Sequence, residues 1–179
     1  MKKIFSLLLC LLTASFIFGQ SSLDIGVEFQ AYPTGILPGI RIEKNFAARH
    51  AIHLRAGANI FNHRNWGKHF TEKGNGYGFS VGYKRYFQPG HERWFLGARS
   101  DLWFNKVNWT KDIALPPYSG TTTITVIQPT AEVGFTFVKN TFYFSPTLAL
   151  GFEINTNTVG EPTGEGAIVL LGLHTGLRF

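Results

Sequence analysis

The feature that most constrains this chain is an alternation of apolar and polar side chains that recurs from residue 23 to the last residue. In its first stretch Leu23, Ile25 and Val27 are separated by Asp24 and Gly26. Successive side chains of a β-strand point to opposite faces of a sheet, whereas a helix repeats about every 3.6 residues. The alternation therefore predicts strands with one apolar and one polar face, and it leaves no helical pattern after the first 20 residues.

Eight such runs follow one another along the chain. They cover residues 23–31, 40–46, 52–60, 77–83, 94–105, 130–137, 142–155 and 169–179. The connections alternate in length: those at 62–75, 106–120 and 156–165 are long, those at 47–50, 88–92 and 138–140 are short, and the first, at 32–38, is of modest length. Long and short connections in alternation are typical of up-and-down barrels with one tightly turned rim. The sequence therefore predicts an all-β fold, an eight-stranded antiparallel up-and-down barrel.

Residues 1–19 have the composition of a cleaved signal peptide. A short basic start precedes an apolar run at residues 4–18, which is shorter than the roughly 20 residues of a helical bilayer span. We expect cleavage after Gly19, which leaves 20–179 as a single exported domain; an uncleaved N-terminal anchor is the alternative. The only cysteine, Cys10, lies in this leader. The mature domain would therefore have no disulfide, no thiolate zinc site and no cysteine nucleophile.

Composition and pattern together indicate which face of the strands points outward. Hydrophobic residues make up 44% of the chain and charged residues only 16%. The apolar faces carry more large side chains than the interior of an eight-stranded barrel can hold. Glycines recur on the polar faces, where they would make room for long neighbours inside a crowded barrel. These are Gly26, Gly57, Gly78, Gly82, Gly97, Gly134, Gly151, Gly172 and Gly176. We therefore expect the apolar faces to meet lipid, because a closed barrel satisfies every backbone group in hydrocarbon.

The polar faces carry acids and bases in nearly equal numbers. Buried charges need partners, so this balance predicts an interior network of ion pairs. Its members would be Asp24, Glu28, Arg41, Glu43, Arg55, Lys84, Arg99, Asp101, Glu132, Glu153, His174 and Arg178, with His53 also available.

Aromatic residues gather towards both ends of the predicted strands. Phe87, Trp94 and Phe137 lie near the short turns, whereas Tyr77 and Phe152 lie near the long connections. Two such belts are typical of barrels that cross a membrane. The alternative is a secreted soluble barrel or sandwich with the two faces reversed.

The chain ends in the sequence LLGLHTGLRF, and its last residues, Leu177 and Phe179, look like the C-terminal assembly signal of Gram-negative outer-membrane proteins. With the leader and eight runs, the domain resembles the small outer-membrane β-barrel family of the OmpA transmembrane and OmpX type. His174 and Thr175 depart from the family's end motif. The resemblance implies an outer-membrane location, periplasmic termini, extracellular long loops, and contact with outer-membrane lipid, lipopolysaccharide and the assembly machinery.

The third connection is a candidate ligand loop because it joins bases with aromatic residues. Its members are Arg64, Trp66, Lys68, Phe70 and Lys73. Such a cluster would suit lipopolysaccharide phosphates or an external ligand, and an ordinary solvated loop is the alternative. His63 and His69 lie in the same loop, but with Glu72 they fall short of a zinc ligand set, so we interpret both as solvated.

The sequence predicts no catalytic residue, cofactor site or metal site, and it predicts no nucleic-acid partner, because the basic charge is spread evenly and the chain is exported. Ser100 and Asp101 lie on opposite faces of one run, which weakens a lipid A-modifying enzyme as an alternative. We expect an integral outer-membrane protein with a role in membrane integrity, adhesion or ligand contact through its loops. A narrow porin-like channel for small solutes is the second alternative.

Overall fold

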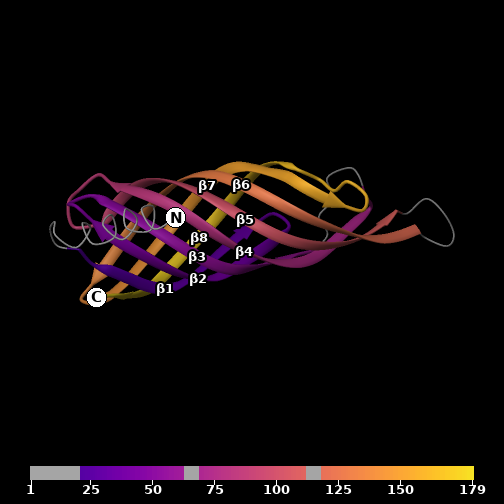
Figure 1. Ribbon diagram of the computed structural model, residues 1–179. Coiled ribbons are helices and arrows are strands. Elements are labelled where there is room, and N and C mark those ends of the chain that lie inside the picture. Colours follow the sequence, from indigo (N-terminus) through magenta and orange to yellow (C-terminus); the bar gives the residue numbers. More distant parts are fainter. Residues whose placement is uncertain (1–20, 63–68, 112–117) are drawn as a thin grey trace, which may run out of the picture.

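The described part of the chain closes into a single cylinder of strands. The computed structural model describes residues 21–62, 69–111 and 118–179. These residues form eight strands in chain order around a closed barrel (Figure 1). The strands are β1 (Leu23–Tyr32), β2 (Gly35–Phe46), β3 (His50–Phe61), β4 (Thr71–Tyr86), β5 (Arg93–Lys111), β6 (Tyr118–Lys139), β7 (Phe142–Val159) and β8 (Gly166–Arg178). The described residues include no helix long and apolar enough to cross a bilayer.

Each strand pairs antiparallel with its neighbours in sequence, and β1 pairs with β8 to close the barrel. At the seam the register runs from Asp24 opposite Arg178 to Ala31 opposite Leu171. The predicted eight-stranded up-and-down barrel is therefore confirmed. The predicted leader, residues 1–19, lies outside the described residues.

Four strands extend well beyond the apolar runs that predicted them. β4 begins at Thr71 rather than at residue 77, β5 continues to Lys111, and β6 already begins at Tyr118. The expected loop bounds of 62–75, 106–120 and 156–165 were therefore wrong, because each of these stretches contains residues of a strand. The first connection is also shorter than expected, since only Pro33 and Thr34 separate β1 from β2. Beyond the apolar band the outer faces of these strands become polar, with Lys106, Asn108 and Thr121 exposed. The pattern of an apolar outer face that identified the runs therefore ends there, although the backbone pairing continues.

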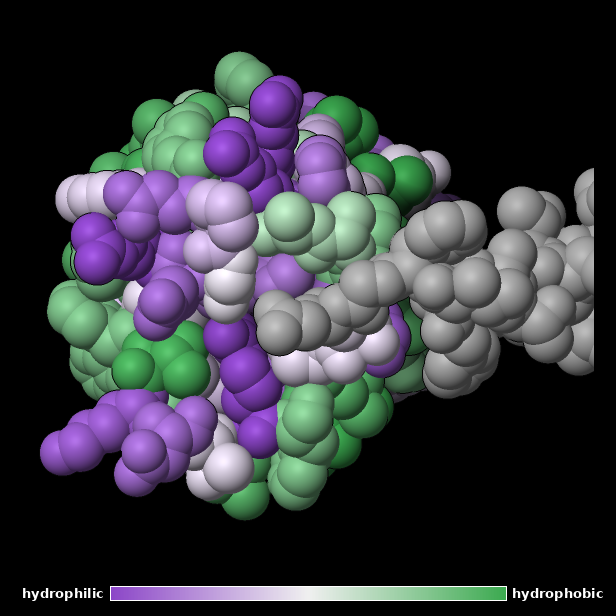
Figure 2. All heavy atoms as spheres, turned by 90° about the vertical axis from the view of Figure 1, so that its left-hand side faces the viewer, coloured by the Kyte–Doolittle hydropathy of each residue, from purple (hydrophilic) through white to green (hydrophobic). Residues whose placement is uncertain are grey.

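The large apolar side chains lie on the outside. Leu54, Ile40 and Phe152 are each more than 60% exposed, whereas Glu28, Arg41 and nearly all other charges of the polar faces are buried. Figure 2 looks at the end of the barrel with the short turns, and it shows hydrophobic residues around the circumference and hydrophilic ones over the mouth. A soluble barrel with reversed faces does not fit this arrangement.

The interior is layered along the barrel axis rather than uniformly polar. An apolar cluster fills the end with the long connections and consists of Leu37, Phe61, Trp103, Val107, Ile124, Val126, Ala149, Ile168 and Leu170. A smaller cluster of Ala51, Tyr86 and Phe95 lies towards the short turns. The charged residues lie between the two clusters. On β5, Arg99 is between Phe95 of the smaller cluster and Trp103 of the larger one, and on β4 Lys84 is two residues before Tyr86.

Two interior glycines show how the strands accommodate these side chains. A Cβ atom at Gly78 would overlap the indole ring of Trp103, and one at Gly82 would overlap the imidazole of His53. Glycine therefore makes room here for large rings from neighbouring strands. This is the role that the sequence pattern predicted for glycine on the polar faces.

Candidate functional site

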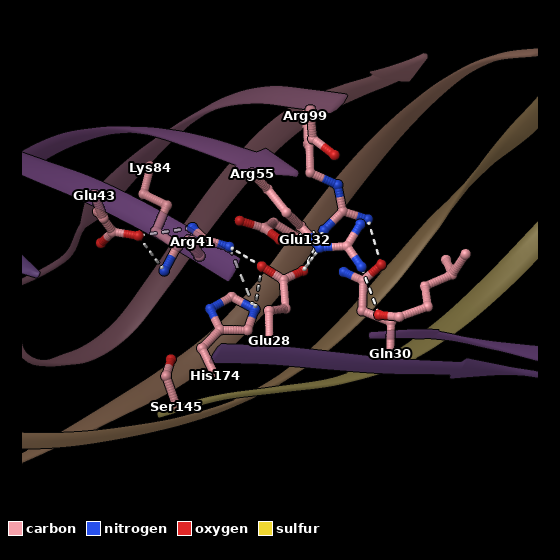
Figure 3. Close-up of polar contacts among 12 residues, drawn as sticks. Glu28, Gln30, Arg41, Glu43, Arg55, Lys84, Arg99, Glu132, Ser145 and His174 are labelled. Atoms are coloured by element: carbon pink, nitrogen blue, oxygen red, sulfur yellow. Dashed lines mark hydrogen bonds and ion pairs between the residues drawn. The ribbon is translucent and has the colours of Figure 1, made fainter. Parts of the chain in front are cut away.

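Glu28 of β1 lies at the centre of the interior charge network (Figure 3). One carboxylate oxygen, Oε2, accepts a hydrogen bond of 2.9 Å from Arg41 Nη1, and the other, Oε1, accepts one of 3.1 Å from Arg99 Nη1. Arg55 Nε is 3.6 Å from Oε1. Three guanidinium groups from three strands thus surround one carboxylate that is fully buried. Charge-assisted hydrogen bonds of this kind offset the cost of removing the ions from water.

Arg41 of β2 connects Glu28 to a second carboxylate nearer the short turns. Its Nη2 donates to Glu43 Oε2 at 2.7 Å, and Lys84 Nζ of β4 is 2.9 Å from the same oxygen. The hydroxyl of Tyr86 donates to the other oxygen of Glu43 at 3.1 Å. The Lys84 ammonium also lies 4.1 Å from the centre of the Phe95 ring, so it has both an ionic and an aromatic partner.

Arg99 of β5 extends the network towards the apolar cluster. Its Nε donates to Asp101 Oδ2 at 2.9 Å and its Nη2 to Gln30 Oε1 at 3.1 Å. The hydroxyl of Ser80 donates to Asp101 Oδ1. Arg55 Nη2 donates to the carbonyl oxygen of Leu37 at 2.5 Å.

The centre of the barrel is electrically balanced. Four carboxylates, Glu28, Glu43, Asp101 and Glu132, face four cations, Arg41, Arg55, Lys84 and Arg99. Glu132 is held loosely, since its closest cationic atom among the described residues is Arg99 Nη1 at 3.8 Å and neither of its oxygens has a hydrogen-bond partner there. Equal numbers of opposite charges leave this part of the interior with no net formal charge, and their ion pairs fill the space between the strands.

The remaining predicted members are Asp24, Arg178, His174 and Glu153. Asp24 and Arg178 pair with each other at the barrel seam, through Arg178 Nε and Nη2 at 2.7 Å each. His174 Nε2 is 3.4 Å from Arg41 Nη1 and 3.7 Å from Glu28 Oε2. Glu153 is buried on β7. His53 is also buried, on β3, against the backbone of Gly82.

Sequence reasoning missed the neutral partners of the network. Gln30, Ser80 and Tyr86 each bind a charged member, and all three are buried. Their signal was present, because Gln30 and Ser80 stand at polar-face positions of their runs. Tyr86 was harder to find, since it follows the predicted run at 77–83 and its face could not be assigned.

The two residues of the predicted assembly signal, Leu177 and Phe179, lie at the C-terminal end of β8 and directly after it. Leu177 pairs with Ile25 of β1 and Phe142 of β7, with its side chain exposed on the outside. The backbone of Phe179 exchanges two hydrogen bonds of 2.9 Å with Leu23, and its side chain is 69% exposed.

A second polar cluster lies at the end with the long connections. His69 is buried, so its interpretation as a solvated loop histidine was wrong. Its Nδ1 is 2.7 Å from Glu72 Oε1, its Nε2 is 3.4 Å from Glu161 Oε2, and its ring stacks on Trp109 at a centroid distance of 4.5 Å. A nearby aromatic ring and two carboxylates remove this histidine from solvent. The sequence could not show this, because Glu161 is 92 residues away.

Glu161 ties the β7–β8 connection to the rest of this cluster. We call the cluster the rim latch and define it as His69, Glu72, Trp109, Lys111 and Glu161. Lys111 Nζ donates to Glu161 Oε2 at 2.5 Å. This hydrogen bond, with smaller contributions from His69, lowers the pKa of the Glu161 carboxyl below its usual value. The latch joins β4, β5 and the last long connection. In the described part of the chain no group of histidine and carboxylate side chains is arranged to hold a metal ion.

The candidate ligand loop can be placed only in part. Arg64, Trp66 and Lys68 lie outside the described residues. Phe70 is 60% exposed and its backbone nitrogen donates to Thr110 O at 2.9 Å. Lys73 lies on the exposed face of β4, within a strand rather than a loop.

Strands β4, β5 and β6 continue beyond their neighbours at this end. β3 stops pairing with β4 at Phe61, opposite Gly74, whereas β4 and β5 remain paired up to Thr71 and Thr110. β5 and β6 remain paired up to Lys111 and Tyr118. The three strands therefore form a sheet that projects past the barrel wall, as the long ribbons at the right of Figure 1 show. We call residues 71–73, 107–111 and 118–122 the projecting sheet.

No family model matches the sequence, and no curated protein matches it. Solved structures do match. One is the attachment invasion locus protein Ail of Yersinia pestis, solved in complex with the heparin analogue sucrose octasulfate. The superposition includes 89% of this chain and 97% of the Ail chain, with a TM-score of 0.50 and 12% sequence identity. The N-terminal β-barrel domain of Pseudomonas aeruginosa OprF aligns over 90% of this chain and 100% of its own, with a TM-score of 0.48 and 17% identity.

At these identities the likeness to Ail concerns the fold. Together with the closed barrel of eight antiparallel strands, it shows that the chain has the architecture of the small outer-membrane β-barrels.

Proposed function

We propose that this protein is an integral barrel of the Gram-negative outer membrane that serves as a closed anchor for an extracellular contact surface. The observation that carries the proposal is the combination of an exposed apolar wall with an interior that is filled and electrically balanced. The wall would meet lipid, the interior blocks the lumen, and the projecting sheet remains available outside the bilayer.

The apolar wall has the height of a membrane. Along β4 and the residue that follows it, the exposed side chains run from Tyr77 to Phe87, both more than half exposed. Ten residue steps of about 3.3 Å, on strands tilted by about 40°, span roughly 25 Å. This is about the height of the apolar band of outer-membrane barrels. The aromatic residues at the two limits suit the interfaces with the lipid headgroups.

The closed interior favours a structural or contact role over transport. The apolar cluster around Trp103 and the ion pairs around Glu28 occupy successive layers of the lumen. Eight strands leave room for side chains but not for a wide aqueous channel. A solute would have to displace both layers.

The projecting sheet supports contact with partners outside the cell. The rim latch ties it to the β7–β8 connection through Lys111 and Glu161. Its outer face carries Lys73 and Asn108, and Lys106 is exposed next to it, just above the aromatic limit at Tyr77 and Phe104. Lysines at this height suit lipopolysaccharide phosphates. We further propose that Leu177 and Phe179, at the end of β8, are the part of the wall that the outer-membrane assembly machinery recognises.

Cell fractionation combined with gel mobility before and after boiling tests the proposal. We expect the protein in the outer-membrane fraction, with a folded form that migrates differently from the boiled form. In planar bilayers the purified barrel should give no steady current. Recovery as a soluble protein without detergent, or a steady ion-selective conductance, would contradict the proposed closed anchor.

A further inference from the structure

The outer wall of the barrel is hollowed on one side. A shallow, open groove of about 700 Å³ lies across β4 to β7, where the side chains of the apolar band become small. Ala98 and Ser100 of β5 pair with Ala131 and Pro129 of β6 and form its floor. Large rings form its walls, Tyr83 on β4 and Phe152 on β7.

The shape of the groove decides what can fill it. Two copies of this chain related by a twofold axis would bring the same surface together, and two concave surfaces leave a void between them. A flexible apolar chain fills a concave channel without that cost. Within the proposed membrane location, the surrounding molecules of that kind are lipid acyl chains.

A polar group lies below the groove, towards the short turns. Arg85 follows Tyr83 by two residues on the outer face of β4, and His50 of β3 stands opposite Arg85 in the strand register. His50 Nδ1 and the hydroxyl of Tyr83 are hydrogen-bonded. Arg85 is exposed and forms no ion pair with any described residue. It nevertheless lies between Tyr83 and Phe87, within the exposed apolar band.

An arginine at this level of the wall needs an anionic partner. A guanidinium is costly within hydrocarbon, and the cost falls towards the interface, where the side chain can reach a headgroup. Arginine binds phosphate through two parallel hydrogen bonds. The short turns of such barrels face the periplasm, so the phosphate nearest to Arg85 would belong to the periplasmic leaflet.

The spacing between the two features fits one lipid molecule. Ser100 stands opposite Val81 in the register, four residues from Arg85 along β4. Four steps of about 3.3 Å on a strand tilted by about 40° amount to about 10 Å along the barrel axis, which is within the roughly 15 Å of one half of the hydrocarbon core. A phosphate at Arg85 would therefore place the acyl chains of its lipid at the level of the groove.

We propose that this wall binds one phospholipid of the periplasmic leaflet, with an acyl chain in the groove over Ala98, Ser100 and Ala131 and the phosphate against Arg85 and His50. The inference rests on the proposed membrane location. It adds a lipid site that is separate from the interior network and from the projecting sheet.

Native mass spectrometry of the full, folded barrel in mild detergent tests the site. The barrel is incubated in turn with phosphatidylglycerol, phosphatidylethanolamine and lipid A, and retained lipid is measured as the activation energy rises. We expect one retained phospholipid, with phosphatidylglycerol held more strongly than phosphatidylethanolamine because the latter carries an ammonium near the phosphate. Preferential retention of lipid A, or a mass corresponding to two copies of the chain, would overturn the assignment.

Two variants examine the two halves of the site separately. Ala98→Leu combined with Ala131→Leu fills the groove, and Arg85→Gln removes the phosphate partner; each should weaken retention roughly tenfold. The matched controls are Ala56→Leu, on the outer face of β3 away from the groove, and Lys139→Gln, which removes an exposed cation at the short-turn end of β6.

Gel mobility before and after boiling accompanies each variant. A folded barrel that retains lipid equally in the variants and the controls would overturn the lipid site and leave the proposed membrane function intact. A wild-type chain that is soluble without detergent would overturn both.

Discussion

Asp24 and Arg178 form a doubly hydrogen-bonded ion pair across the seam at which the first and last strands close the barrel. The two bonds, from Arg178 Nε and Nη2, are both 2.7 Å long. Arg178 Nη2 also donates to the backbone oxygen of His91, at 3.1 Å, in the turn between β4 and β5. The pair thus connects the two ends of the domain to a turn on another part of the rim.

We expect Arg178→Gln to weaken this closure. The substitution removes both charge-assisted bonds to Asp24 at a site that is only slightly exposed, so the free energy of unfolding should fall by about 1–2 kcal/mol. Urea unfolding of the barrel in lipid vesicles, followed by gel mobility, measures the change. Arg49→Gln, in the exposed β2–β3 turn of the same rim, is the control and should leave the unfolding midpoint in place. Equal midpoints for Arg178→Gln and the control would contradict the proposed role of the seam pair.

Glu28 should be the most sensitive charge of the interior. Glu28→Gln leaves Arg41, Arg55 and Arg99 around a neutral amide, and removal of one partner from a buried ionic network typically costs about 3–5 kcal/mol. Unfolding in vesicles gives the difference in stability. Glu92→Gln, an exposed carboxylate in the β4–β5 turn, provides the matched change and should be nearly neutral. A loss below about 1 kcal/mol for Glu28→Gln would show that the network is hydrated and loosely coupled.

Gly78 and Phe79 are adjacent on β4 and should respond in opposite ways to substitution by valine. A Cβ atom at Gly78 would overlap the buried Trp103 ring, so Gly78→Val should destabilise the barrel by about 3 kcal/mol or prevent folding. Phe79 is 56% exposed on the outer wall, and Phe79→Val should reduce stability by less than about 1 kcal/mol in lipid. The fraction of each variant that folds into vesicles is measured by gel mobility. Similar behaviour of the two variants would contradict the inward orientation of Gly78.

The sequence was sufficient to predict the barrel because the lipid-facing wall imposes one requirement on every strand. Residues such as Val27 and Leu54 must alternate with inward polar residues wherever the strand crosses the apolar band, and a slip by one residue would reverse both faces. The number of strands, their order and the direction of the faces follow from that pattern. The length of the strands does not, because Thr121 and Lys73 lie beyond the band, where water satisfies either face.

The partners within the interior could be predicted only as a set. The pattern identified Glu28, Arg41 and Arg99 as inward charges, but it could not show that all three meet. Which charges meet depends on the stagger between strands, and the apolar run of one strand does not specify its offset from the next. The apolar cluster around Trp103 was missed for a related reason. Val107 fell within the predicted connection at 106–120, and Ile124 and Val126 fell in a stretch that was assigned to no run, because these stretches lack an apolar outer face.

The rim latch should respond to pH through Glu161. Its pKa is lowered chiefly by the hydrogen bond from Lys111, and then by His69. A carboxyl whose pKa is lower in the folded state than in the unfolded state stabilises the folded state at any pH above its unfolded pKa, here 4.5. This stabilisation is lost as the pH falls through the lower folded pKa. Nuclear magnetic resonance titration of the Glu161 side chain in micelles should therefore give a midpoint below 4.5. In Lys111→Met the midpoint should rise towards 4.5, whereas in Lys106→Met, which removes a lysine on the outer face of the same strand, it should not move. A wild-type midpoint at or above 4.5, or identical midpoints in wild type and Lys111→Met, would show that Lys111 does not hold Glu161 in the latch.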